Sequence, residues 1–180
     1  MHARLAETMD YVEDKRKELL QSFAGVPSER LRQRASADGW SVAEILDHLS
    51  VVEAGIARLI AKRATRAREA GLGEETSTES VLASFDSHRA RLEATTEMQA
   101  PTTVLPRANV DINEAIKGLE SSRAALRVAV LGASGLSLSE IKHTHPILGE
   151  LDLYQWLIFV GQHEGRHRKQ IERTLNSIAV

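Results

Sequence analysis

The sequence contains no cysteine, no long apolar run and no clear excess of charge of one sign, and each absence excludes a class of protein. Without cysteine the chain can form no disulfide, no thiolate zinc site and no catalytic thiol. The longest apolar run, Trp156–Val160, is too short to cross a bilayer. The N-terminal residues lack the apolar segment of a secretion signal. We therefore expect a soluble cytoplasmic protein that has no membrane partner.

The charge of the chain is nearly balanced. The formal net charge is −2, and acidic and basic residues are mixed along the sequence, which argues against a general nucleic-acid-binding protein. The chain has 180 residues, of which 42% are hydrophobic and 27% are charged, and this composition is ordinary for a globular protein. We expect residues 1–180 to form a single domain.

Four long stretches have apolar residues at spacings of three and four, which is typical of amphipathic helices. They cover residues 3–24, about 42–68, about 112–131 and 150–178, and a shorter helix is expected at about 78–97. Ser41 and Glu44 form a capping box at the start of the second stretch, and Asn109 or Asp111 can cap the third. Residues 136–149 are expected to form a loop, and no strand pattern is present. The pattern predicts an all-α four-helix bundle with one short accessory helix.

Two histidines lie one turn apart on the apolar face of the last predicted helix. Side chains four residues apart on a helix are roughly 5–6 Å from each other, so His163 and His167 can share one metal ion. His48 lies near the edge of the apolar face of the second predicted helix. Three imidazoles and an open fourth position filled by water are typical of a catalytic metal site. We favour this interpretation over three separate core histidines, because buried imidazoles without partners are costly.

Two other metal sites fit the sequence less well. Residues 163–167 match the H-E-x-x-H motif of zinc proteases, which needs a third ligand downstream of the motif helix. Only thirteen residues follow His167, and their one carboxylate side chain, Glu172, continues the same helix. A di-iron site would need two Glu-x-x-His motifs on separate helices, but the second motif, from Glu140 to His143, falls in the predicted loop.

The order of several short motifs resembles that of the DinB-like superfamily, a group of damage-inducible, metal-dependent hydrolases and transferases. The matching residues are Gly39-Trp40-Ser41 before a helix with His48, then Ser122-Arg123, His145-Pro146-Ile147-Leu148-Gly149, Trp156-Leu157-Ile158-Phe159, His163-Glu164, Arg166-His167 and Gln170-Ile171. The resemblance implies a four-helix bundle that binds one divalent metal through His48, His163 and His167. It also implies a metal-dependent transferase or hydrolase that acts on a small molecule, with a low-molecular-weight thiol as one class of substrate.

Three further residues are candidates for catalytic roles. Arg16 and Arg123 interrupt apolar stripes on helices without a metal ligand, so they could line the opposite wall of a pocket and bind a substrate carboxylate. The alternative is a side chain whose charged end reaches solvent. Glu164 resembles the base of the zinc proteases, but it also lies four residues before Arg168, where a surface ion pair is expected.

The sequence leaves the metal and the activity open. Three imidazoles accept zinc or nickel, which we expect first, and also iron or cobalt. The alternative function is a non-catalytic metal-binding or helix-bundle interaction protein with the same fold. A homodimer formed through a long helix face is compatible with the resemblance.

Overall fold

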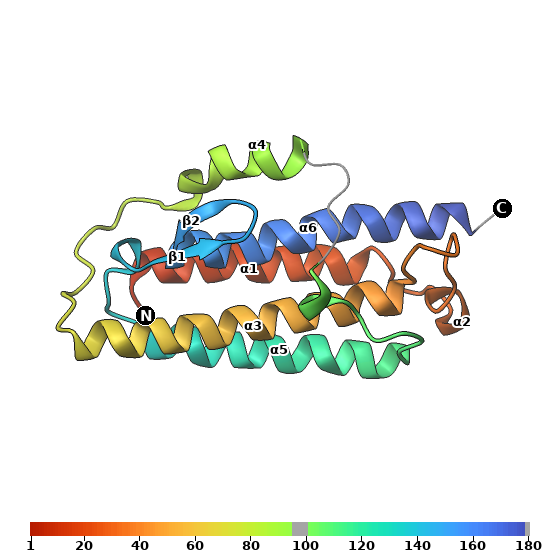
Figure 1. The fold of residues 1–180 in the computed structure, drawn as a ribbon, viewed down its shortest axis with the longest axis horizontal. Coiled ribbons are helices and arrows are strands. Elements are labelled where there is room, and N and C mark those ends of the chain that lie inside the picture. The colour runs from red at the N-terminus through yellow and green to blue at the C-terminus, as the bar shows by residue number, and fades with distance from the viewer. Residues whose placement is uncertain (95–100, 179–180) are drawn as a thin grey trace.

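Four long helices lie side by side along the long axis of the molecule and form a bundle (Figure 1). The structure is a computed structural model and describes residues 1–94 and 101–178. The bundle helices are α1 (Ala3–Gln21), α3 (Val42–Glu69), α5 (Ile112–Ala133) and α6 (Leu153–Ser177). The predicted four-helix bundle is therefore confirmed. No helix within the described ranges has both the length and the apolar content that crossing a membrane requires.

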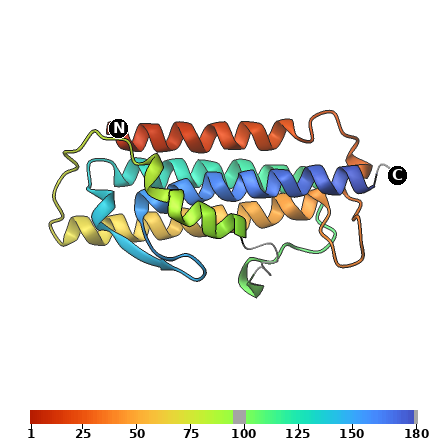
Figure 2. The same ribbon diagram turned by 90° about the horizontal axis from the view of Figure 1, so that it is seen from above.

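The accessory helix α4 (Asp86–Ala94) lies on the return path between two parallel helices. Helices α1 and α6 run in one direction and α3 and α5 in the other, so the chain must travel back along the bundle after α3 (Figures 1 and 2). Helix α4 follows a 3₁₀ turn, η1 (Leu82–Phe85), and thus begins later than predicted. The predicted helix end at 95–97 falls outside the described residues. A short helix, α2 (Ser28–Leu31), and two 3₁₀ turns, η2 (Thr102–Val104) and η3 (Leu138–Glu140), belong to other connections.

A small β-hairpin occupies part of the predicted loop and the start of the predicted last helix. Strand β1 (Lys142–His145) pairs antiparallel with β2 (Gly149–Asp152). The prediction of a helix from Glu150 was therefore wrong, because residues 150–152 bond to β1 and Asp152 caps α6. The Asp152 carboxylate accepts a hydrogen bond from the Gln155 N–H at 2.9 Å, and the Gln155 side chain accepts from the Asp152 N–H at 3.0 Å.

The other helix starts follow the predicted capping residues. Ser41 caps α3, and its N–H donates to the Glu44 carboxylate at 2.8 Å while the Glu44 N–H donates to Ser41 Oγ at 3.3 Å. Asp111, rather than Asn109, caps α5. Asn109 instead has a positive φ of 54° in the turn before the helix. These caps fix where α3 and α5 begin and therefore which of their faces turn inward.

A layer of buried charged residues crosses the bundle between two apolar clusters. One cluster contains Phe85, Leu126 and Leu157, and the other contains Leu19 and Ile45, among many more. Each of the four long helices contributes one charged residue to the layer between them: Arg16, Glu53, Arg123 and Glu164. Unpaired charges in such a place would cost far more free energy than the core could supply, so these residues must pair with one another.

Helices α1 and α6 approach closely at Gly161. A Cβ atom added there would lie 2.6 Å from Tyr11 Cε1 and 3.2 Å from Lys15 Cγ. We expect Gly161→Ala to lower the free energy of unfolding by about 1–3 kcal/mol, because the Tyr11 ring must move away. The matched control is Gly165→Ala in the same helix, where nothing lies within 4 Å of the new atom. The free energy of unfolding of that variant should rise by up to about 1 kcal/mol, because alanine has the higher helix propensity. Urea denaturation measures both variants. Equal changes in the two would show that the contact with Tyr11 does not matter.

Candidate metal centre

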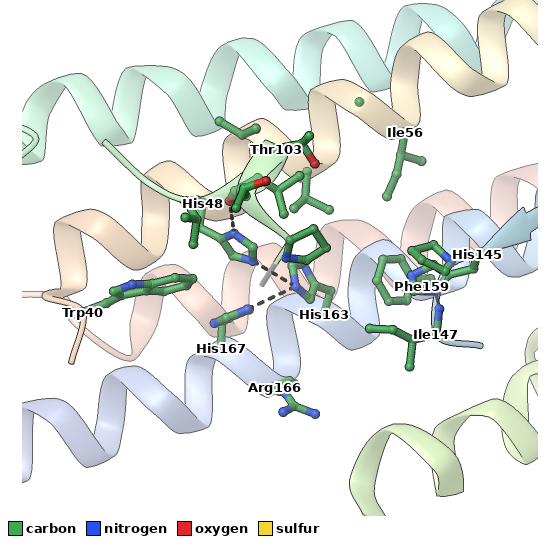
Figure 3. A pocket seen from close by; sticks show the side chains of 18 of the residues that line it. Trp40, His48, Ile56, Thr103, His145, Ile147, Phe159, His163, Arg166 and His167 are labelled. Carbon is green, nitrogen blue, oxygen red and sulfur yellow. Dashed lines mark hydrogen bonds between the residues drawn. The ribbon is translucent and has the colours of Figure 1, made fainter. Parts of the chain in front are cut away.

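The three predicted histidines converge on one point between α3 and α6 (Figure 3). His48 lies in the second turn of α3, and His163 and His167 lie one turn apart on α6. The Nε2 atom of His163 is 3.3 Å from Nε2 of His48 and 3.1 Å from Nε2 of His167. The facing nitrogens of all three rings lie within 4.8 Å of one another. Residues that are 115 positions apart in the sequence are thus brought into contact.

Hydrogen bonds on the outer side of two rings fix which nitrogen faces the centre with a lone pair. His48 Nδ1 lies 2.6 Å from the Val104 carbonyl oxygen, and His167 Nδ1 lies 2.7 Å from Oε1 of Gln170. Both partners are acceptors, so each Nδ1 carries the hydrogen and each Nε2 presents a lone pair. A single hydrogen on His163 Nε2 could satisfy only one of these two lone pairs.

All three imidazoles are held in the neutral form that binds metals. Burial lowers the pKa of His48, and the Val104 carbonyl only partly opposes this effect. Burial, with His48 as a second cause, lowers the pKa of His167 to about 3. Burial and the two neighbouring histidines bring the pKa of His163 well below its ordinary value. Neutral rings with inward lone pairs are the state in which histidine binds a divalent metal.

Two of the three separations between the nitrogens match those around a tetrahedral ion. Two nitrogen ligands of zinc, each about 2.0–2.1 Å from the metal, are about 3.3 Å apart at tetrahedral angles. The two Nε2 separations from His163 are close to this value. The donor set and these two separations therefore fit a divalent cation that the three imidazoles would hold, and all three histidines line a cavity.

The histidine cluster lines a cavity of about 1130 Å³. Trp40 lies at one end of this cavity and His145, Ile147 and Phe159 at the other, with the three histidines between them (Figure 3). The walls come from α3 and α6, from the β-hairpin and from residues 101–105. The volume is sufficient for a small molecule.

Arg16 and Arg123 do not line this cavity, so their expected role in its wall was wrong. Both side chains are buried in the charged layer, which also excludes the alternative of a charged end in solvent. Arg16 Nη2 donates to Glu53 Oε2 at 2.8 Å, and Arg123 Nε donates to Glu53 Oε1 at 2.6 Å. Both arginines also border a separate cavity of about 530 Å³. Carboxylates and the backbone carbonyls of Leu119 and Val12 occupy the guanidinium donors, so these arginines hold helices together.

Glu164 belongs to the same layer, and the expected surface pair with Arg168 was wrong. The Glu164 carboxylate is buried and accepts from Arg16 Nε at 2.7 Å and from Arg123 Nη2 at 2.9 Å. Burial raises the pKa of Glu164, and the two guanidinium groups oppose this rise. Arg168 instead pairs with Glu172. Glu164 therefore points away from the histidine cluster and is no base for it.

Sequence reasoning missed Glu53, which is the centre of this layer. Glu53 is 2% exposed and binds both arginines and the Ser122 hydroxyl. It lies four residues after Leu49 and three before Ile56, within the buried face of α3. A glutamate at such a position is a signal of a buried ion pair, and it could have indicated the partners of the two arginines.

His145, which the sequence offered only as part of the family resemblance, also borders the cavity. Its Nδ1 accepts hydrogen bonds from the N–H groups of Ile147 and Leu148 at 3.1 and 3.2 Å, which fixes the turn of the hairpin. Its ring lies 4.6 Å from the Phe159 ring between centroids. Burial, with a smaller effect of His88, lowers the pKa of His145 from 6.5 to about 4.

This shift predicts a pH dependence of stability. Between the unfolded pKa of 6.5 and the folded pKa of about 4, the unfolded chain binds a proton at His145 that the folded chain does not. Stability is therefore complete above this range and falls as the pH falls, by about 2 kcal/mol from His145 alone between about pH 7 and pH 5. Urea denaturation with a chelator present should give a smaller loss for His145→Asn. Equal losses in both proteins would contradict the prediction.

Comparison with known proteins agrees with this fold. The family model of the DinB superfamily matches residues 11–171. The uncharacterized protein YuaE of Bacillus subtilis (strain 168) is 25% identical over 171 residues, which cover 94% of this chain and 98% of that protein. The crystal structure of TT2238, a four-helix bundle protein, aligns with a TM-score of 0.62 at 19% identity and covers 94% of this chain and 98% of that one. The chain therefore belongs to the DinB superfamily.

Proposed function

We propose that the protein is a metal-dependent enzyme that binds one divalent cation through His48, His163 and His167 and acts on a small molecule. The observation that carries the proposal is the convergence of three neutral imidazoles, with two Nε2 lone pairs that no single hydrogen can satisfy. A cation bound there would supply Lewis-acid chemistry, which lowers the pKa of a water or thiol ligand. Hydrolysis and thiol transfer are the two reactions that this chemistry suits.

Residues around the cluster hold the rings of His48 and His167 in the orientation that metal binding requires. Val104 and Gln170 hold the rings of His48 and His167 in one tautomer, as carbonyl partners of metal-bound histidines commonly do. Trp40 covers the cluster on one side, with its ring 5.0 Å from that of His48 and 6.4 Å from that of His167 between centroids. These contacts keep the rings of His48 and His167 oriented.

Elemental analysis of protein purified without an affinity tag tests the metal site. We expect about one equivalent of a divalent metal per chain, with zinc or nickel before iron or cobalt. His48→Ala should contain none after the same purification. Three inert core histidines would give no metal in either protein, and this result would contradict the proposal.

A substrate screen separates an enzyme from a protein that only binds metal. The metal-loaded protein would be assayed with activated esters and amides for hydrolysis, and with low-molecular-weight thiols and electrophiles for transfer. We expect turnover that the His48→Ala variant lacks. A metal-loaded protein without any turnover would favour the non-catalytic alternative.

A further inference from the structure

We propose that the Nε2–H group of His145 holds a carboxylate oxygen of the substrate at the end of the cavity opposite Trp40. The inference rests on the proposed function and names the class of its substrate: a small molecule with a carboxylate at one end and its reacting group at the other. His145 is then a positioning residue rather than a metal ligand, since Phe159 lies between its ring and His163.

The hairpin turn fixes the tautomer of His145. Two backbone N–H groups, those of Ile147 and Leu148, donate to Nδ1, so Nδ1 cannot carry a hydrogen. The ring hydrogen is therefore on Nε2. His145 as a whole residue is only 7% exposed, yet it borders the cavity, and no acceptor for Nε2 is present among the described residues. A mostly buried donor without a partner strengthens the binding of a molecule that offers an acceptor oxygen.

The charged residues that line the cavity favour a carboxylate as that acceptor. Three arginines and one aspartate are the residues with a fixed charge among those that line the cavity in the described part of the chain: Arg58, Arg166, Arg173 and Asp38. Their net positive charge attracts an anion into the cavity. His145 itself stays neutral near pH 7, so it offers one directed hydrogen bond without adding a second charge.

The distance between His145 and the histidine cluster suits a small molecule. The Phe159 ring centroid lies 4.6 Å from that of His145 and 5.3 Å from that of His163, so one aromatic ring separates the donor from the nearest histidine of the cluster. Phe159 and Ile147 give this part of the cavity an apolar wall (Figure 3). A substrate would therefore place an apolar middle against Phe159, its carboxylate at His145 and its reacting group at the cluster.

Binding of paired thiols to the cobalt-loaded protein tests this arrangement. The probes are ω-mercaptocarboxylates of increasing length, each compared with the alkanethiol of the same length, and the sulfur-to-cobalt charge-transfer absorption reports binding at the histidine cluster. At one chain length we expect the carboxylate to bind about tenfold more tightly than its alkanethiol, the effect of one hydrogen bond to a charged group. Equal affinities at every length would overturn the proposal and leave the metal site intact.

Two variants separate the role in the cavity from the role in the turn. His145→Asn places Oδ1 at the position of Nδ1, so the turn keeps its acceptor, but no donor remains at the position of Nε2. His145→Gln places an amide near the Nε2 position and removes the acceptor of the turn. We expect the preference for the carboxylate to vanish in His145→Asn and to persist in part in His145→Gln.

If the preference for the carboxylate persisted in His145→Asn and vanished in His145→Gln, His145 would serve the turn alone and the proposal would be overturned. An unchanged preference in His145→Asn would also overturn it. If the parent protein gave no charge-transfer absorption with either thiol, the metal site of the proposed function would fail, and this inference would fail with it.

Discussion

Replacing His163 by alanine should lower the affinity for Zn²⁺ by more than about a hundredfold, because the loss of a group that only supports a ligand already costs about 10–100-fold. His163 is the central ring of the cluster, and its Nε2 faces those of both His48 and His167. Two imidazoles on separate helices would remain, without the helical pair that sets their spacing. Competition with a chromophoric chelator measures the affinity directly.

Two controls make this result specific. Gln170→Ala removes the acceptor of His167 Nδ1 and should weaken zinc binding by about 10–100-fold, an intermediate effect. His143→Ala removes a histidine that borders the same cavity but pairs with Arg63. Its affinity should equal that of the parent protein. If His163→Ala and His143→Ala behaved alike, the cluster would not be the zinc site.

Replacing Glu53 by alanine should lower the free energy of unfolding by about 3–5 kcal/mol, the cost of removing one partner from a buried ion-pair network. Glu53 accepts from Arg16, Arg123 and Ser122. Without it, the single buried carboxylate of Glu164 would face two guanidinium groups. Chemical denaturation at neutral pH, with a chelator present, gives the difference.

Two milder variants keep this prediction testable if Glu53→Ala does not fold. Ser122→Ala removes one hydrogen bond to Glu53 and should cost about 1–3 kcal/mol. Arg127→Ala removes a pair with Glu13 in which the arginine side chain is 57% exposed, and it should cost less than about 1 kcal/mol. If the buried network contributed little to stability, Glu53→Ala, Ser122→Ala and Arg127→Ala would all change the free energy of unfolding by similar small amounts.

The fold and the histidine cluster could be predicted because both depend on helical periodicity. Apolar spacing located the four long helices, and the capping residue Ser41 fixed where α3 begins. His163 and His167 share a face of α6 by spacing alone. His48 was grouped with them because it also lies on an apolar helix face, and the family resemblance supported this grouping, since periodicity within one helix does not say which helix it faces.

The charged layer and the hairpin could not be predicted in the same way. An arginine in a buried ion pair and an arginine that lines a pocket have the same sequence pattern within one helix. Only the partner on another helix distinguishes them. Arg16 and Arg123 find Glu53 and Glu164 across the bundle, and sequence spacing contains no measure of that distance. The strands of the hairpin are too short for an alternating pattern. The role of His145 depends on that hairpin, so it became visible only in three dimensions.

The cavity has walls of two different kinds: two helices of the bundle, and two short segments outside it. The helices that carry the ligands are bound together by the charged layer, so most changes there would damage the whole molecule. The hairpin and residues 101–105 face the cavity from outside the bundle. Under the proposed function, substitutions in these two short segments would change which molecules the cavity accepts while the histidine cluster stays the same.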